Sequence, residues 1–228
     1  MLQFYILILG RKVKMATLFN KIYKKLASNK QLQTIYAYIP KKELTEEEWK
    51  EKGRPVPPPH IVKEKAISDY QKSSQYKIFV ETGTYLGEMV KAQMNNFEEI
   101  ISIELDATLY IKAVKKFNKY SYIKILNGDS GQVLKKIVPS LHGNSIFWLD
   151  GHYSGGITAR GNKDCPIFEE LQSILESRVN HIILIDDARL FNGDGDYPTI
   201  KKLKDFVMSY NNKCKIEIKD DITRITLK

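Results

Sequence analysis

The sequence of 228 residues contains little cysteine and no apolar run long enough to span a membrane. Its two cysteines, Cys165 and Cys214, lie far apart and outside any CxxC or Cys/His pattern. This spacing argues against zinc knuckles and a secreted disulfide framework and favours a reducing compartment. The longest apolar run, residues 2–9, has about half of the roughly 20 residues that cross a bilayer, and it lacks the flanks of a secretory signal. We therefore expect a cytoplasmic protein.

The positive charge is concentrated in the first third of the chain. The net charge is +9, and residues 1–77 account for all of it, with 16 Lys/Arg against 7 Asp/Glu. Residues 78–228 carry 20 of each kind. A nucleic-acid enzyme more often carries basic charge around its active cleft, so the neutral body argues against that substrate class.

The N-terminal part is predicted to be an extension followed by a linker. Residues 11–30 place apolar residues near one helical face with lysines between them (Val13, Leu18, Ile22, Leu26). Such a helix can lie on anionic lipid, or it can be a solvated helix that packs its apolar stripe on the protein. Residues 41–60 are charged and then proline-rich. We therefore expect an extension and linker over 1–60 and the main domain over 61–228, with Met1 or Met15 as the true start.

From residue 77 onward, short apolar runs alternate with longer amphipathic stretches. The runs predict strands over residues 77–81, 100–105, 122–126, 145–150 and 181–186. Helices are expected over 61–76, from near Leu86, Ala107, Gly131 and Pro166, and from Pro198 to about Tyr210. Two segments of period 2 around Asp220-Asp221 predict a terminal antiparallel hairpin. The pattern indicates an α/β protein with a three-layer, mostly parallel open sheet, in which ligands bind at the carboxyl ends of the strands.

The loop after the first predicted strand has the composition of a ligand-binding turn. Gly83 and Gly87 let the backbone turn sharply and approach a ligand closely. A dinucleotide fingerprint would need further glycines where Tyr85 and Glu88 stand, so the NAD interpretation fails. The negative Glu81 suits a cationic group such as the ammonium of an amino acid. The loop can also be a purely structural turn.

Two further acids follow the second and third predicted strands. Glu104 stands about 20 residues beyond the glycine loop, where a carboxylate can accept hydrogen bonds from the hydroxyls of a ribose. Asp129 in the segment 127–130 can accept from an adenine amino group, or it can only cap the next helix.

Residues 77–227 resemble the class I S-adenosylmethionine-dependent methyltransferases. FVETGTYLG matches their cofactor loop, SIELD their ribose-binding acid and NGDS their adenine-side turn. The resemblance implies a Rossmann-like sheet of strand order 3-2-1-4-5-7-6, with the hairpin as its last two strands. The resemblance also implies that the cofactor is held by Glu81, Gly83, Thr84, Gly87, Glu104, Asp129 and Ser130.

Three carboxylates follow the fourth and fifth predicted strands. Asp150 ends one run, and Asp186 and Asp187 end the other. Parallel neighbours lie about 4.8 Å apart, so these acids should converge at one rim, where a hard divalent cation would relieve their repulsion. Alternatively, they cap loops or pair with Arg160 and Arg189. WLDG followed by IDD also resembles the metal-dependent macrocin-type sugar O-methyltransferases, which implies that the three acids bind Mg²⁺ and that the metal grips adjacent hydroxyls of the acceptor.

The segment after Asp150 is predicted to hold the catalytic base and the acceptor. In the macrocin-type family an Asp two residues after the first metal ligand is the general base, and here that position is His152. An imidazole can take a hydroxyl proton at neutral pH, so we expect His152, beside Asp150, to be catalytic. The segment that follows is long and glycine-rich and has no apolar periodicity, as is typical of an active-site loop. The residues in it that we expect to contact the acceptor are Tyr153, Arg160 and Lys163. We interpret residues 192–196 as a turn in which Asp196 caps the following helix.

The sequence therefore predicts an S-adenosylmethionine-dependent, Mg²⁺-assisted O-methyltransferase. Its acceptor is expected to be a sugar or another small molecule of glycan or secondary-metabolite biosynthesis. One alternative is a non-catalytic cofactor-binding or membrane-docked adaptor, in which residues 1–30 would make the membrane contact. A less favoured alternative is a nucleic-acid methyltransferase, for which no NPPY-like signature or basic cleft is visible. The sequence is compatible with a homo-oligomer under each of these interpretations.

Overall fold

The computed structural model of the protein describes residues 43–151 and 165–227, which belong to one compact unit. Its centre is a seven-stranded sheet of order β3-β2-β1-β4-β5-β7-β6. The strands are β1 (Ile78–Thr82), β2 (Glu99–Glu104), β3 (Ile123–Asn127), β4 (Ser145–Leu149), β5 (Ile182–Ile185), β6 (Lys215–Lys219) and β7 (Ile222–Thr226). The strands β1 to β5 pair in parallel, whereas β7 is antiparallel to both β5 and β6. The predicted fold class and strand order are confirmed.

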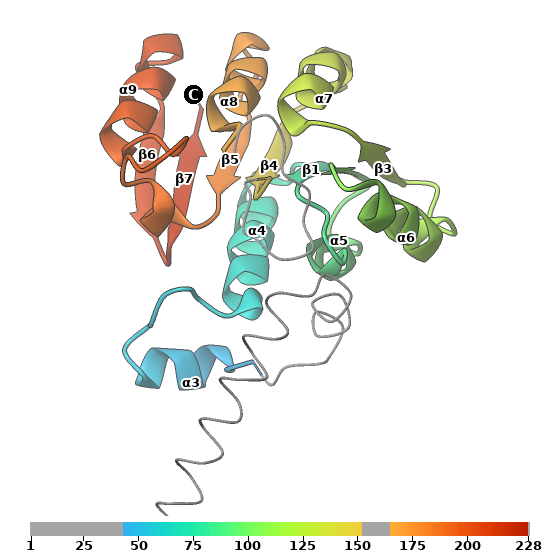
Figure 1. Ribbon diagram of the computed structural model, residues 1–228, viewed down its shortest axis with the longest axis horizontal. Helices are drawn as coiled ribbons and strands as arrows, with labels where there is room; N and C mark the ends of the chain where they lie inside the picture. The colour runs from blue at the N-terminus through green and yellow to red at the C-terminus, as the bar shows by residue number, and fades with distance from the viewer. Residues whose placement is uncertain (1–42, 152–164, 228) are drawn as a thin grey trace, which may run out of the picture. The chain divides into compact units, whose positions relative to one another are not determined.

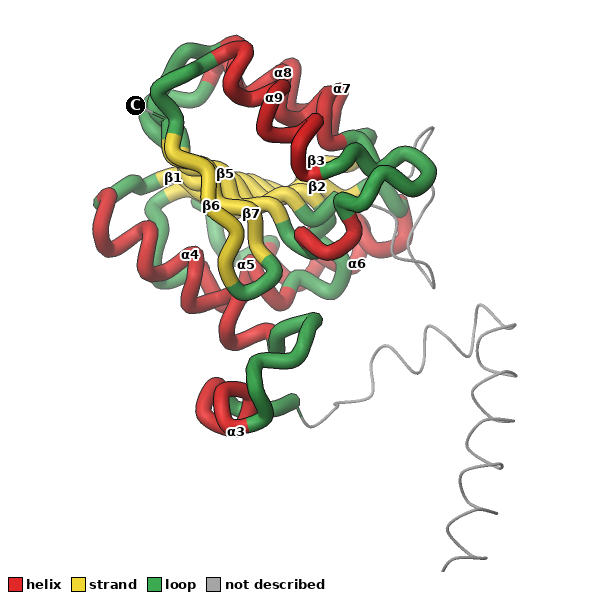
Figure 2. Tube along the Cα trace, turned by 90° about the vertical axis from the view of Figure 1, so that its left-hand side faces the viewer, coloured by secondary structure: helices red, strands yellow, loops and turns green. Residues whose placement is uncertain are grey.

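Helices cover both faces of the sheet (Figures 1 and 2). They are α3 (Glu46–Glu51), α4 (His60–Ser74), α5 (Glu88–Gln93), α6 (Ala107–Phe117), α7 (Ser130–Ile137), α8 (Ile167–Glu176) and α9 (Ile200–Tyr210), with short 3₁₀ turns η1 (Val138–Ser140) and η2 (Ala188–Leu190). Figure 2 shows α4, α5 and α6 on one side of the yellow sheet and α7, α8 and α9 on the other. Within this part of the chain, no helix has both the length and the apolar character needed to cross a membrane.

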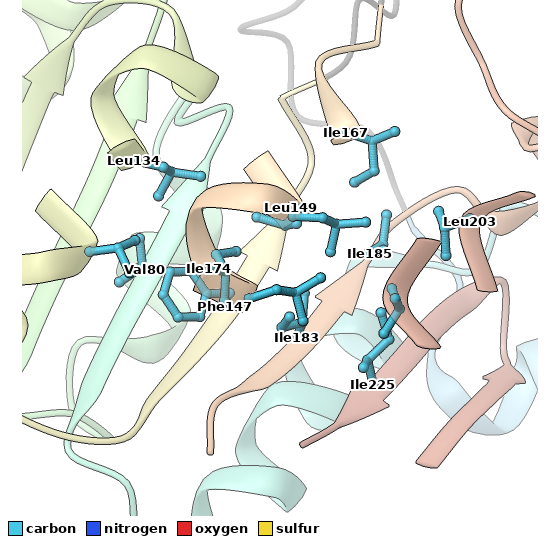
Figure 3. Packing of buried hydrophobic residues seen from close by; sticks show 14 of the residues in the cluster. Val80, Leu134, Phe147, Leu149, Ile167, Ile174, Ile183, Ile185, Leu203 and Ile225 are labelled. Atoms are coloured by element: carbon cyan, nitrogen blue, oxygen red, sulfur yellow. The ribbon is translucent and has the colours of Figure 1, made fainter. Parts of the chain in front are cut away.

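The central strands form because short runs of β-branched and aromatic residues can be buried on both faces at once. Every residue of β1, β4 and β5 is buried. Val80, Phe147 and Ile183 are register partners on neighbouring strands and pack toward α7, α8 and α9 (Figure 3). Phe79 and Trp148, one position away along the same strands, belong to the core under α4, α5 and α6. This period of 2 gives the sheet two separate cores, one on each face.

The last helix begins later than the sequence predicts. We expected α9 to open at Pro198 with Asp196 as its cap, but the cap is Thr199, whose hydroxyl accepts from the backbone N–H of Lys202 at 3.2 Å. The expected capping by Asp196 is therefore wrong. The helix begins only after Thr199, because the backbone of Thr199 is extended and pairs with Asn192 of the same loop in an isolated antiparallel bridge.

A short helix lies within the segment predicted to be a linker. Thr45 and Glu48 form a capping box at the start of α3, and Trp49 on this helix is buried. The indole N–H of Trp49 donates to the carbonyl of Pro55 at 2.8 Å, which holds the proline-rich turn against the helix. The Thr-x-x-Glu spacing was the available sequence signal for this helix. The division of the chain at residue 60 stays a prediction.

Candidate functional site

The predicted cofactor residues come together at the carboxyl ends of β1 and β2. The two strands are parallel neighbours, so Glu81 in β1 and Glu104 at the end of β2 lie at the same edge of the sheet. The loop after β1 is tied to β2 because the backbone N–H groups of Gly83 and Thr84 both donate to the carbonyl of Ile103, at 2.9 and 3.2 Å. The topology therefore brings the loop after β1 and the end of β2 together, as the sequence predicted, and leaves their binding of a cofactor as a prediction.

Gly83 is the residue that lets this loop lie close to the end of β4. Its φ is +85°, and a Cβ atom here would overlap with the backbone carbonyl of Asp150. Only glycine meets both conditions without strain. Gly87, with φ of +72°, lets the loop turn into α5, and a Cβ here would meet the ring of Phe117 at 2.6 Å.

Glu104 is held in one orientation before any ligand arrives. One carboxylate oxygen accepts from the backbone N–H of Tyr85 at 2.7 Å, and the other accepts from that of Asp106 at 2.8 Å. Burial raises the pKa of Glu104, and these backbone donors offset part of that rise. Each oxygen keeps a further lone pair, so the carboxylate can still accept two hydroxyl donors.

Glu81 is buried beneath the loop and belongs to a short hydrogen-bond chain. The hydroxyl of Ser102 donates to Glu81 Oε2, and the hydroxyls of Thr84 and Ser102 share a further hydrogen bond of 2.6 Å. Burial is the largest cause that raises the pKa of Glu81 well above its usual value, and the nearby carboxylate of Asp150 adds to the rise. A buried carboxyl of this kind is a suitable partner for a cationic group that enters the site.

Asp129 is the N-cap of α7, which was one of the two alternatives predicted for it. Its side chain accepts from the backbone N–H of Gln132 at 3.1 Å and so begins α7, of which Ser130 is the first residue. Capping occupies one acceptor position of the Asp129 carboxylate. The contact of Asp129 with adenine and the contact of Ser130 with the cofactor stay predictions.

The acids after β5 are paired with cations. Lys63 on α4 donates to Asp186 Oδ2, and its Nζ lies 3.7 Å from Asp187 Oδ1. Arg189 in η2 donates to the same Asp187 oxygen at 2.7 Å and also to Asp221 in the turn between β6 and β7. The expected alternative of pairing with Arg189 is therefore observed for Asp187. Lys63 is a functional candidate that the sequence prediction missed.

This arrangement does not fit the Mg²⁺ site predicted at Asp150, Asp186 and Asp187. Asp186 Oδ1 accepts from the backbone N–H of Asp187 at 2.8 Å, while Oδ2 accepts from Lys63. An Mg²⁺ ion requires about six oxygen ligands in near-octahedral geometry and would compete with these donors. Over residues 43–151 and 165–227, no group of three or more His, Cys, Asp or Glu side chains is arranged to hold a metal ion. The described side chains at this rim therefore do not form the predicted Mg²⁺ site.

The predicted base and the predicted acceptor contacts lie outside the described residues. They are His152, Tyr153, Arg160 and Lys163. The described chain resumes at Cys165, directly before α8.

Comparisons with known proteins agree with the fold. No family model and no curated protein matches the chain. Among solved structures, it is similar to an O-methyltransferase from Bacillus cereus in complex with S-adenosylhomocysteine (SAH), with a TM-score of 0.56 and 12% identity over 86% of this chain and 96% of that chain. It is also similar to the N-methyltransferase NodS from Bradyrhizobium japonicum WM9, with a TM-score of 0.50 and 9% identity over 74% and 96% of the two chains.

The fold is that of the class I S-adenosylmethionine-dependent methyltransferases. The expectation of this fold, which rested on the motifs of the first three strand ends, is confirmed. Since an O- and an N-methyltransferase share it, the fold alone does not select the acceptor atom.

Proposed function

We propose that the protein is an S-adenosylmethionine-dependent O-methyltransferase that acts on a hydroxyl of a small acceptor. The observation that supports this most directly is the preformed cofactor side of the site. Gly83 brings the loop against the end of β4, Glu104 presents an oriented carboxylate, and Glu81 lies buried beneath both. The fold shared with the O-methyltransferase from Bacillus cereus supports the same conclusion.

In this proposal, each acid contacts a different part of the cofactor. Glu104 accepts from the ribose hydroxyls, and Glu81 faces the ammonium of the methionine part. The backbone of the loop after β1 passes close to the methionine part because residue 83 has no side chain. S-adenosylmethionine supplies an electrophilic methyl group when bound, so the protein contributes mainly alignment of the acceptor oxygen, the methyl carbon and the sulfur.

The acceptor hydroxyl loses its proton during the transfer, and we propose His152 as the base that removes it. His152 follows the end of β4 by three residues, next to Asp150 and Gly151. An imidazole there can take the proton at neutral pH. We propose Tyr153, Arg160 and Lys163 as acceptor contacts, and a sugar as the acceptor, because WLDG and IDD resemble the macrocin-type enzymes.

The test is turnover with a panel of hydroxyl acceptors. The full-length protein is incubated with S-adenosylmethionine and sugars, nucleotide sugars or phenolic compounds, and SAH and methylated product are measured by mass spectrometry. We expect methylated sugar with the wild type and none with His152→Ala, which should still bind SAH. Methylation of an amine but of no hydroxyl across the panel would refute the proposed acceptor class.

A second candidate is a cofactor-binding adaptor that contacts membranes. The observation that favours it is the basic charge of residues 1–77, whose first 42 residues lie outside the described part. It predicts binding to anionic vesicles that is lost on deletion of residues 1–40, together with SAH binding but no turnover. Turnover by the full-length protein would exclude the non-catalytic form of this candidate.

A further inference from the structure

Lys63 lies on the side of α4 that faces the sheet. Ala66 and Ile67, three and four residues later on the same helical face, are buried in the core under α4. The Lys63 side chain is only 16% exposed, and it points along this face to the end of β5. Figure 1 shows α4 below β4, near the middle of the sheet. A lysine at this position is withdrawn from solvent, which is costly unless its charge is compensated.

The compensation comes from the acids at the strand ends. Asp186, with a side chain 1% exposed, accepts from the Lys63 ammonium, and Asp187 lies 3.7 Å from it. Burial alone would lower the pKa of Lys63, but the charges of Asp186, Asp150 and Asp187 outweigh burial and raise it. The pKa of Asp186 is raised by its own burial, which Lys63 opposes. A carboxylate as buried as that of Asp186 is costly without a cation, and the Lys63 ammonium is its partner.

The lysine thus stands where the sequence predicted a divalent cation. A metal at this rim would balance the charge of the three carboxylates and present a positive centre to the acceptor oxygen. The Lys63 ammonium reaches this rim from α4, where it pairs with Asp186 and lies 3.7 Å from Asp187. It has three N–H donors, of which Asp186 takes one. As a compact point charge on a flexible stem, it can direct another donor at an acceptor oxygen.

We propose that Lys63 takes the place of a divalent cation at the ends of β4 and β5, orients the acceptor there, and makes the methyl transfer independent of metal. The proposal rests on the proposed function for the acceptor, but the cation site itself can be measured without any turnover. Lys63 is thereby a positioning residue on an element that precedes the first strand of the sheet.

The test compares three full-length proteins, the wild type, Lys63→Met and Lys65→Met. Each is titrated with Mn²⁺ alone, and binding is measured by calorimetry and by the electron paramagnetic resonance signal of free Mn²⁺. Lys63→Met keeps the length of the side chain and removes its charge. Lys65→Met is the matched control, because Lys65 is on the same helix but is exposed and pairs with Glu46 at 2.9 Å. We expect no bound Mn²⁺ in the wild type or in Lys65→Met, and one Mn²⁺ per chain in Lys63→Met.

Stoichiometric Mn²⁺ binding by the wild type would overturn the proposal, as would a folded Lys63→Met protein that binds none. If Lys63→Met does not fold, Lys63→Ala replaces it with the same expectations, and the wild-type titration remains decisive by itself. SAH binding is measured on each variant and should not change, so a loss of cofactor binding in every protein would indicate failure of the proposed function instead. Once an acceptor is known, a chelator should leave wild-type turnover unchanged and should abolish any turnover of Lys63→Met.

Discussion

Replacement of Glu104 by Gln should weaken cofactor binding by a calculable amount. The carboxylate accepts from Tyr85 N at 2.7 Å and from Asp106 N at 2.8 Å, and in the proposed complex it also accepts from the ribose. An amide of the same shape has one oxygen and one NH₂ group, so one backbone donor then faces another donor. On the ligand side, the ribose loses a charged acceptor, which contributes about 1.5–3 kcal/mol. At about 1.4 kcal/mol for each factor of ten, the affinity should fall about tenfold to a hundredfold.

The assay is calorimetric titration with SAH, which carries the same adenosine as the substrate cofactor. Glu99→Gln is the matched control, because Glu99 stands at the other end of β2 and pairs with Lys124 at 2.7 Å. We expect Glu99→Gln to bind SAH as the wild type does. If Glu104→Gln bound SAH within about twofold of the wild type, the assignment of Glu104 to the ribose would be refuted.

Three further predictions concern pH and stability. Burial raises the pKa of Glu81, and a cationic ammonium beside it should lower this pKa again. SAH affinity should therefore rise with pH, SAH binding should release protons in calorimetry, and Glu81→Gln should remove both effects. Burial lowers the pKa of His181 from 6.5 to about 4, so denaturant unfolding should show about 3 kcal/mol of stability lost as the pH falls from 6.5 to 4. His181→Gln should lack this loss and His142→Gln, at an exposed position, should retain it. In the same assay Phe147→Ala, in the core, should cost about 3–5 kcal/mol, whereas Ile111→Ala, at 64% exposure, should stay within about 0.5 kcal/mol; equal effects would contradict the packing described.

Much of the fold could be predicted because its signals are local. The short apolar runs are strands, which are fully buried in β1, β4 and β5, and the period-2 segments on either side of Asp220 and Asp221 form the terminal hairpin. The places of the loop glycines and of the acids at the strand ends could also be predicted, because they are set by the chain next to them, whereas their contacts with a cofactor stay predictions. Gly83 and Glu104 are where the motifs placed them.

The cation at the acid-rich rim could not be predicted by the same means. Lys63 precedes Asp186 by more than a hundred residues, and only the sheet order β1-β4-β5 brings α4 over the end of β5. A lysine in a helix is ordinarily solvated, so its type gives no warning. The sequence did carry one signal for Lys63, which is that it stands three and four residues before Ala66 and Ile67 and so lies on the apolar face of the helix. The start of α9 was missed for a different reason, because a bridge to Asn192, in the same loop, keeps Thr199 extended.

The central claim is that the ends of β1 and β2 form a binding site for S-adenosylmethionine. The most direct test is calorimetric titration of the wild-type, full-length protein with SAH at neutral pH, with adenosine alone and methionine alone as comparison ligands. The account predicts saturable binding of one SAH per chain, tighter than either fragment. Absence of SAH binding by a folded protein would contradict it.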